Sequence, residues 1–168
     1  MKKPLLPVLG AVIALLSCSA STKARAADDY FVDQGVCVEL SGVRTVTRDG
    51  VPLEGARLGL VGVMDFGVGG LYVQHATGED RTLTDVMGVF GLRVPFAKRL
   101  EAGPYLRGGF EFVDGGPRDG SNFTSAAGFD VGVWVTRRIQ LLAFIERVDT
   151  FEDSRRDFGL SLRGVIRR

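Results

Sequence analysis

The sequence predicts an all-β protein that folds as an eight-stranded antiparallel up-and-down β-barrel. After a short segment over residues 27–34, apolar and polar residues alternate with a period of two in eight successive stretches of a domain expected over residues 35–168. No stretch of useful helical length appears there, and glycine is frequent and evenly spread, which is typical of many turns and closely packed strands. The connections are alternately long and short, which places all the long ones at one end of the sheet.

The N-terminus predicts an export signal over residues 1–26. Two lysines form its charged region, Leu5 to Leu16 form its apolar core, and Ala24–Ala26 matches an A-x-A cleavage site. The apolar core is too short to cross a membrane as a mature helix. The signal indicates a protein that leaves the compartment where it is made.

A second interpretation of this region concerns Cys18. The segment Leu15–Cys18 resembles a bacterial lipobox, which would make Cys18 an acylated N-terminus, although leucine fits poorly just before the small residue. Cleavage after Ala26 would instead leave Cys37 as the sole cysteine. That outcome excludes an intramolecular disulfide and a cysteine-based metal site, and no metal or cofactor is expected.

Each predicted strand carries an apolar series on one face and a polar or small series on the other. Each runs for about 8 to 14 residues, and a tilted strand that spans a membrane needs ~9–11. In chain order the strands are centred on Val36–Leu40, Leu58–Met64, residues 70–77, Val86–Val94, Leu106–Phe112, Phe129–Val135, Ile139–Val148 and Phe158–Leu162.

Residues 126–148 are long and apolar enough to suggest one membrane helix. Such a helix would hold Asp130, Glu146 and the adjacent Arg137 and Arg138 at membrane depth, and each would cost roughly 2.5–3.5 kcal/mol at the centre. As two strands, the same residues place Phe129, Val131 and Val133 on one face, and Thr136–Arg138 becomes a tight turn. The segment therefore predicts a hairpin.

The connections indicate which end of the barrel carries more irregular chain. TRDGVPLEG, ATGEDR, DGGPRDGSN and DTFEDSRRD are expected as long loops, and shorter turns are expected around DFGVGG, FAKR and TRR. The GVGG stretch at 67–70 lacks the lysine and helix of a phosphate-binding loop, so it is expected to be part of a tight turn. Asn122 begins a glycosylation sequon and is expected in an exposed loop.

A signal-bearing chain with eight alternating strands and alternating connections resembles the small outer-membrane barrels of the OmpA/OmpX type. The resemblance implies a bacterial outer-membrane location, short turns toward the periplasm and long loops outside. It also implies a non-enzymatic role in envelope integrity, or in surface interaction or adhesion through the loops. The chain departs from many members by ending in two arginines, Arg167 and Arg168, rather than in an aromatic residue.

Alternation alone does not show whether the polar side chains face the interior of the barrel or the outside. Aromatic residues near strand ends, the small polar residues of the second face and the scarcity of lysine favour a membrane barrel in contact with outer-membrane lipids. The alternative is a soluble periplasmic lipocalin-like barrel with a small apolar ligand inside. The aromatic residues that would form interfacial girdles are Phe66, Phe96, Phe112, Phe151 and Phe158.

In a membrane barrel the polar face would point inward. It carries five acids and four arginines, which are predicted to pair into a network that plugs the lumen, because unpaired charges in a confined interior are costly. These residues are Glu39, Arg57, Asp85, Arg93, Arg107, Glu111, Asp130, Glu146 and Arg163.

Catalysis and nucleic-acid binding receive little support. His75 is the sole histidine, and Asp80, Asp85, Ser121 and Ser125 would have to approach it to form a Ser/His/Asp group, without any supporting motif. A net charge of +1 and the lack of a dense basic stretch exclude a nucleic-acid footprint.

The loop end is expected to be acidic and could meet surface partners. Its expected acids are Asp49, Glu54, Glu79, Asp80, Asp114, Asp119, Asp149, Glu152, Asp153 and Asp157, set against Arg48, Arg81, Arg118, Arg155 and Arg156. The opposite end is expected to be basic, with Lys98, Arg99, Arg137, Arg138, Arg167 and Arg168.

Overall fold

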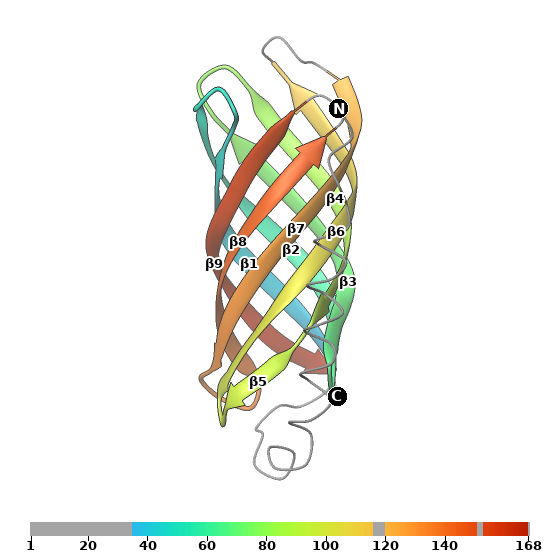
Figure 1. Ribbon diagram of the computed structural model, residues 1–168, viewed down its shortest axis with the longest axis vertical. Helices are drawn as coiled ribbons and strands as arrows, with labels where there is room; N and C mark the ends of the chain where they lie inside the picture. Colours follow the sequence, from blue (N-terminus) through green and yellow to red (C-terminus); the bar gives the residue numbers. More distant parts are fainter. Residues whose placement is uncertain (1–34, 116–119, 151–152, 168) are drawn as a thin grey trace, which may run out of the picture. The chain divides into compact units, whose positions relative to one another are not determined.

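The structure is a computed structural model that describes residues 35–115, 120–150 and 153–167 (Figure 1). These residues form strands joined by short connections, and no helix among them is long and apolar enough to cross a membrane. The strands are β1 (Gly35–Val46), β2 (Pro52–Met64), β3 (Gly67–Thr77), β4 (Thr82–Leu92), β5 (Val94–Ala97), β6 (Leu100–Asp114), β7 (Gly120–Trp134), β8 (Ile139–Thr150) and β9 (Ser154–Arg167).

The sheet closes on itself as a barrel. Apart from β4 and β5, strands that follow one another in the chain pair antiparallel; in addition β1 pairs with β9, and β4 pairs with β6. The short β5 continues the path of β4 beyond Arg93 and pairs only with the start of β6. Eight tilted strands therefore surround the interior (Figure 1), and the predicted eight-stranded up-and-down barrel is confirmed.

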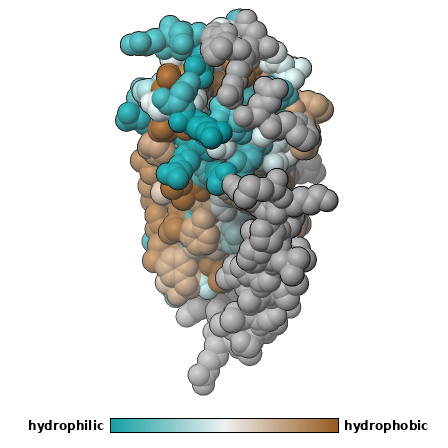
Figure 2. All heavy atoms as spheres, turned by 45° about the horizontal axis from the view of Figure 1, so that its top comes forward, coloured by the Kyte–Doolittle hydropathy of each residue, from teal (hydrophilic) through white to brown (hydrophobic). Residues whose placement is uncertain are grey.

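The period-two pattern separates two faces of opposite character. In β8, for example, Ile145 is 58% exposed on the outside and the adjacent Glu146 is 2% exposed in the interior. Apolar residues cover the outer wall of the barrel, and hydrophilic ones gather at the end that carries the β1–β2 and β3–β4 connections (Figure 2). A lipocalin-like barrel has the opposite arrangement, so the soluble alternative does not fit this fold.

The segment 126–148 forms most of the β7–β8 hairpin. β7 and β8 pair from Thr124↔Thr150 to Trp134↔Gln140. Residues 135–138 connect the strands and hold both arginines outside the barrel wall. The prediction of two strands, made from the alternation and the cost of buried charge, is confirmed.

The connections predicted as long are shorter than expected. They span residues 47–51, 78–81, 115–119 and 151–153, compared with 65–66, 98–99 and 135–138 at the other end. Polar residues near the strand ends had suggested loops. Because antiparallel pairing satisfies backbone groups whatever the side chain, the strands continue through these residues as ribbons beyond the apolar wall.

Two local expectations were wrong, because the strands include residues that had been expected in a turn or a loop. Residues 67–70 begin β3, and the turn lies at 65–66. A Cβ at Gly70 would lie 2.2 Å from the Leu60 carbonyl oxygen, so the glycine permits close approach of β2 and β3. Asn122 lies within β7, opposite Glu111 of β6, and is half-buried.

Candidate functional site in the barrel interior

The barrel interior is filled with charged and aromatic side chains. Eight of the nine predicted interior residues are buried, and Asp130 is partly buried. Three further charged residues that the sequence analysis did not include are also buried there: Glu101, Arg155 and Asp157. Arg155 and Asp157 had been expected in a loop, which was wrong, because β9 already begins at Ser154.

The centre of the interior is organised around Glu146 of β8. Its Oε1 accepts charge-assisted hydrogen bonds from Nη2 of both Arg57 and Arg107, and its Oε2 accepts one from Tyr105 Oη at 3.0 Å. The Glu146 side chain is fully buried. One carboxylate on β8 therefore links two other strands across the lumen, β2 through Arg57 and β6 through Arg107 and Tyr105.

A second cluster lies toward the loop end and is organised around Arg155 of β9. Its guanidinium pairs with the carboxylates of Asp85 and Glu111 across the lumen and, through Nε at 3.3 Å, with Asp157. Gln74 joins this cluster to the central one. Its Nε2 donates to Asp157 at 2.9 Å, and its Oε1 accepts from Arg57 Nε at 2.9 Å.

A third cluster begins toward the short-turn end, where β1 meets β9. Arg163 Nη2 lies 2.8 Å from Glu39 Oε2, which also accepts a hydrogen bond from Tyr72 Oη at 2.9 Å. Arg163 Nη1 donates to Gln140 Oε1 at 3.0 Å, and Gln140 Nε2 in turn donates to Glu101. This chain of contacts extends the network to the end of the barrel.

Arg93 lies in the interior at the short-turn end of the barrel. It sits at the interruption between β4 and β5, donates to Glu101 through Nε at 3.0 Å, and donates through Nη1 to the Met64 carbonyl at 3.0 Å. Its guanidinium lies 5.9 Å from the ring centroid of Trp134, which is fully buried. The interruption thus turns an arginine inward across the mouth of the barrel.

Glycines make room for the two interior tyrosines. A Cβ at Gly59 would lie 2.3 Å from the ring of Tyr72, its cross-strand partner, and one at Gly128 would lie 2.4 Å from the ring of Tyr105. Each ring lies flat over the bare backbone of the neighbouring strand. Small residues on the polar face are therefore required by the narrow bore, as eight strands leave little interior space.

The space left in the lumen is small. A cavity of about 20 Å³ at the centre is lined by Asp130, Arg107 and Tyr105 among others, and another of about 50 Å³ lies near Arg155. About 10–15 Å³ holds one water molecule, so these cavities hold a few waters at most.

The residues considered for catalysis are not gathered. His75 points outward from β3, where its Nδ1 lies 3.0 Å from Thr84 Oγ1, whereas Asp85 points inward to Arg155. Ser121 and Ser125 lie on β7, separated from β3 by β4 and β6. In the described part of the chain, no group of three His, Cys, Asp or Glu residues could hold a metal ion.

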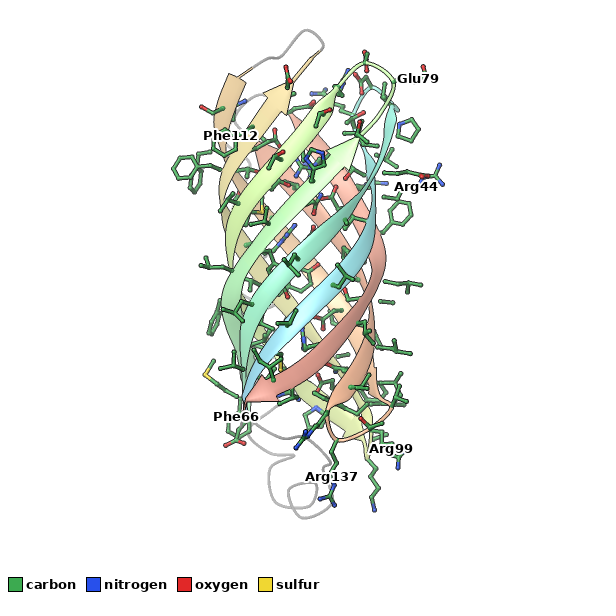
Figure 3. The ribbon with its side chains drawn as sticks, turned by 180° about the vertical axis from the view of Figure 1, so that it is seen from behind. Arg44, Phe66, Glu79, Arg99, Phe112 and Arg137 are labelled. Carbon is green, nitrogen blue, oxygen red and sulfur yellow. The ribbon has the colours of Figure 1, made fainter. Side chains whose placement is uncertain are left out.

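The two ends of the barrel carry different outward side chains (Figure 3). Arg44, Glu79 and Phe112 lie toward the loop end, and Phe66, Arg99 and Arg137 lie toward the short-turn end. Among the residues expected at the loop end, Asp119, Arg118 and Glu152 fall outside the described residues. The signal peptide, Cys18, Phe151 and Arg168 fall outside them as well.

One loop carboxylate is held locally. Asp49 accepts hydrogen bonds from the Thr47 hydroxyl and from Arg81 Nη2, the latter at 3.1 Å. The bond from Thr47 is the largest cause of a lowered pKa at Asp49, and Arg81 adds to it. The β1–β2 turn is therefore stabilised by an ionised carboxylate.

The barrel is similar to solved structures at low sequence identity. Neisserial surface protein A matches with a TM-score of 0.61 and 11% identity, over 78% of this chain and 96% of that chain. Ail, the attachment invasion locus protein of Yersinia pestis, matches with a TM-score of 0.52 and 11% identity, over 79% and 96%. The de novo designed TMB2.3 matches with a TM-score of 0.51 and 14% identity, over 80% and 97%. The chain has the fold of the small OmpA/OmpX-type barrels.

The sequence itself matches no protein-family model and none of the curated proteins compared with it.

Proposed function

We propose that the protein is a non-enzymatic, exported barrel of the bacterial outer membrane whose interior is sealed, and that it contributes to envelope integrity. One observation carries the proposal. Large apolar side chains cover the outer wall, with Leu160 71% and Phe110 57% exposed, and arginine–carboxylate pairs fill the inside. Water on the outside would leave the apolar wall unfavourably hydrated, whereas lipid would not.

The dimensions of the apolar wall support a membrane setting. Outward apolar residues run from Phe158 to Ile166 on β9 and from Leu100 to Phe112 on β6. With a rise of about 3.3 Å per residue and a tilt of about 40°, these stretches rise roughly 20–30 Å along the barrel axis. The apolar band of outer-membrane barrels is about 25 Å tall.

The sealed interior supports a structural role rather than transport. The nearest aqueous route would pass Arg155, Glu146 and Arg93, each of which is buried and bonded across the lumen. Breaking such pairs to admit an ion is costly, because each leaves an uncompensated buried charge. We therefore expect no steady conductance.

Surface interaction is a second candidate role. It is favoured by the outward polar residues at the loop end and by the name of the Yersinia pestis protein, which refers to attachment and invasion. In this orientation the ribbons that extend beyond the apolar wall face the outside, as in the OmpA/OmpX type. The connections are short, so the strand ends would supply most of the contact surface.

Fractionation and gel mobility test the location. The protein should remain in the envelope fraction after carbonate or urea extraction and should migrate differently with and without boiling. Release into the periplasmic fraction without a mobility shift would overturn the membrane proposal. Purified protein in planar bilayers should show no channel events, and regular conductance steps would overturn the sealed lumen.

The role itself is tested in a deletion strain. Increased sensitivity to detergent and bile salts, restored by the wild-type gene, is expected for an integrity role. Unchanged sensitivity with reduced binding to host-cell surfaces would favour adhesion instead. The His75→Ala variant should restore the strain fully and leave envelope lipid composition unchanged, and an altered composition would contradict the non-enzymatic assignment.

A further inference from the structure

Four arginines gather on the outside of the barrel where β1, β8 and β9 leave the apolar wall. Arg44 points outward from β1, Arg147 from β8 and Arg156 from β9, and Arg48 lies in the adjoining β1–β2 connection. Figure 3 shows Arg44 projecting away from the barrel toward the loop end. We call these four residues the arginine collar.

The collar places like charges beside one another. Arg156 lies directly opposite Arg147 in the β8–β9 pairing and opposite Val46 in the β1–β9 pairing, so Arg44 is its diagonal neighbour. Like charges directly opposite each other destabilise a sheet. Such an arrangement is favourable when an anion binds between the guanidinium groups.

Protein carboxylates compensate only part of this charge. Arg147 pairs with Asp149 at 3.0 Å, and Glu54 lies opposite Arg44 in the β1–β2 pairing without an ion pair between them. Within the described residues, Arg44, Arg48 and Arg156 form no ion pair. On the outer faces of these strands, Glu54 and Asp149 face the four arginines, and Asp49, beside Arg48, is bound to Arg81. The arginines therefore outnumber the acids that face them on the barrel wall.

A groove lies beside these residues. It has a volume of about 390 Å³ and is lined by Arg48, Arg147 and Arg156, together with Val46, Thr47 and Ser154 among others. Small-molecule sites typically measure about 300–1,000 Å³, so the groove has room for a phosphorylated sugar head group. Its polar lining is arginine and hydroxyl, the groups that best bind phosphate oxygens.

The collar lies one residue pair above the apolar wall. Phe158 is opposite Arg44 on one side and opposite Ile145 on the other, and Leu160 and Leu40 continue the wall away from the loop end. An arginine at this level can lay its aliphatic stem on the apolar surface and place its guanidinium among lipid head groups. The same strands therefore carry an apolar surface suited to acyl chains and, next to it toward the loop end, a group of arginines suited to phosphate.

From this geometry we propose that the arginine collar binds the phosphate of an acylated, phosphorylated glycolipid of the outer leaflet, whose acyl chains lie along the β1–β9–β8 wall. This inference rests on the proposed outer-membrane location, and it adds a defined lipid site. The occupant is the lipid and not free phosphate, since the apolar wall continues directly from the groove.

The test uses the full chain folded in phosphatidylcholine nanodiscs and titrated with lipid A, a phosphorylated acylated disaccharide. The probe variant is Arg147→Gln/Arg156→Gln, and the matched control is Arg137→Gln/Arg138→Gln, which removes two outward arginines at the opposite end. A hydrogen bond to a charged group contributes about 1.5–3 kcal/mol, so the probe variant should bind lipid A roughly ten- to a hundredfold more weakly. The control should change affinity by less than about threefold.

Three outcomes would overturn the inference. They are unchanged lipid A binding by the probe variant, equal binding of lipid A stripped of its phosphates, and full displacement of lipid A by inorganic phosphate. The heat-dependent mobility shift is recorded for every variant. Loss of that shift in the wild-type protein would count against the membrane proposal, whereas a retained shift without collar-dependent binding would count against the lipid site alone.

Discussion

Replacing Glu146 with glutamine is the sharpest perturbation of the interior. Glutamine keeps the shape of the side chain and removes its charge, while Arg57 and Arg107 remain buried beside it. Arg57 keeps a carboxylate of Asp157 at 3.9 Å. Arg107 pairs with no other carboxylate in the described chain, so the substitution leaves a buried guanidinium uncompensated.

The expected loss follows from this burial. Removing one partner of a buried ion pair costs about 3–5 kcal/mol of unfolding free energy. The Asp157 contact to Arg57 offsets part of this loss, and the weakened bond from Tyr105 adds to it. With a urea dependence of about 2 kcal/mol per molar, a loss of this size lowers the unfolding midpoint by roughly 2 M.

The assay is reversible urea unfolding in lipid vesicles, followed by the fluorescence of the sole tryptophan, Trp134, and by the mobility shift. The matched control is Asp149→Asn on the same strand. Its partner Arg147 is 63% exposed, and exposed pairs contribute only about 0–1 kcal/mol. Equal midpoint shifts for the two variants, or a Glu146→Gln variant as stable as the wild-type protein, would refute the argument that interior ion pairs hold the barrel together.

Three other predictions follow from the described contacts. Phe110→Arg places a charge on the lipid-facing wall and should cost about 2–4 kcal/mol, seen as a lower folding yield into vesicles, whereas Phe110→Leu should fold normally. Gly128→Ala pushes a methyl group against the Tyr105 ring and should cost about 1–3 kcal/mol of unfolding free energy, with Gly42→Ala, where a Cβ meets nothing within 4 Å, as the unaffected control. Asp49 should titrate below the ordinary aspartate range in an NMR pH series, so its contribution to the β1–β2 turn is present at neutral pH and is lost as pH falls through the lowered pKa. Thr47→Val should raise that pKa, and an unchanged value would contradict the assigned cause.

Periodicity predicted the fold well because the two faces of each strand differ so strongly. Val131 and Val133 alternate with Asp130 and Gly132, and only a strand separates such residues cleanly. The ends of strands were less predictable. Arg155 and Asp157 lie in a polar stretch of the kind that is also typical of loops. Their even spacing from Arg163, however, places them on the same inward face of β9.

The pairing inside the barrel could not be derived from sequence. Whether Glu146 contacts Arg57 or Arg93 depends on the register of several strand pairs and on where β4 meets β6. A shift of one residue in any register exchanges the two faces of a strand. The sequence therefore predicted which residues face inward more readily than which of them meet.

The pairing of β1 with β9 has a consequence for the order in which the molecule can assemble. The contact between Glu39 and Arg163 joins residues separated by 124 positions, so it forms only after the last strand has been synthesised and brought to the first. Topologies dominated by such distant contacts fold slowly. Until closure, the two edge strands expose unpaired backbone groups beside apolar side chains, and such edges promote aggregation. An unclosed chain therefore needs protection in transit, and formation of the β1–β9 seam is the event that ends this need.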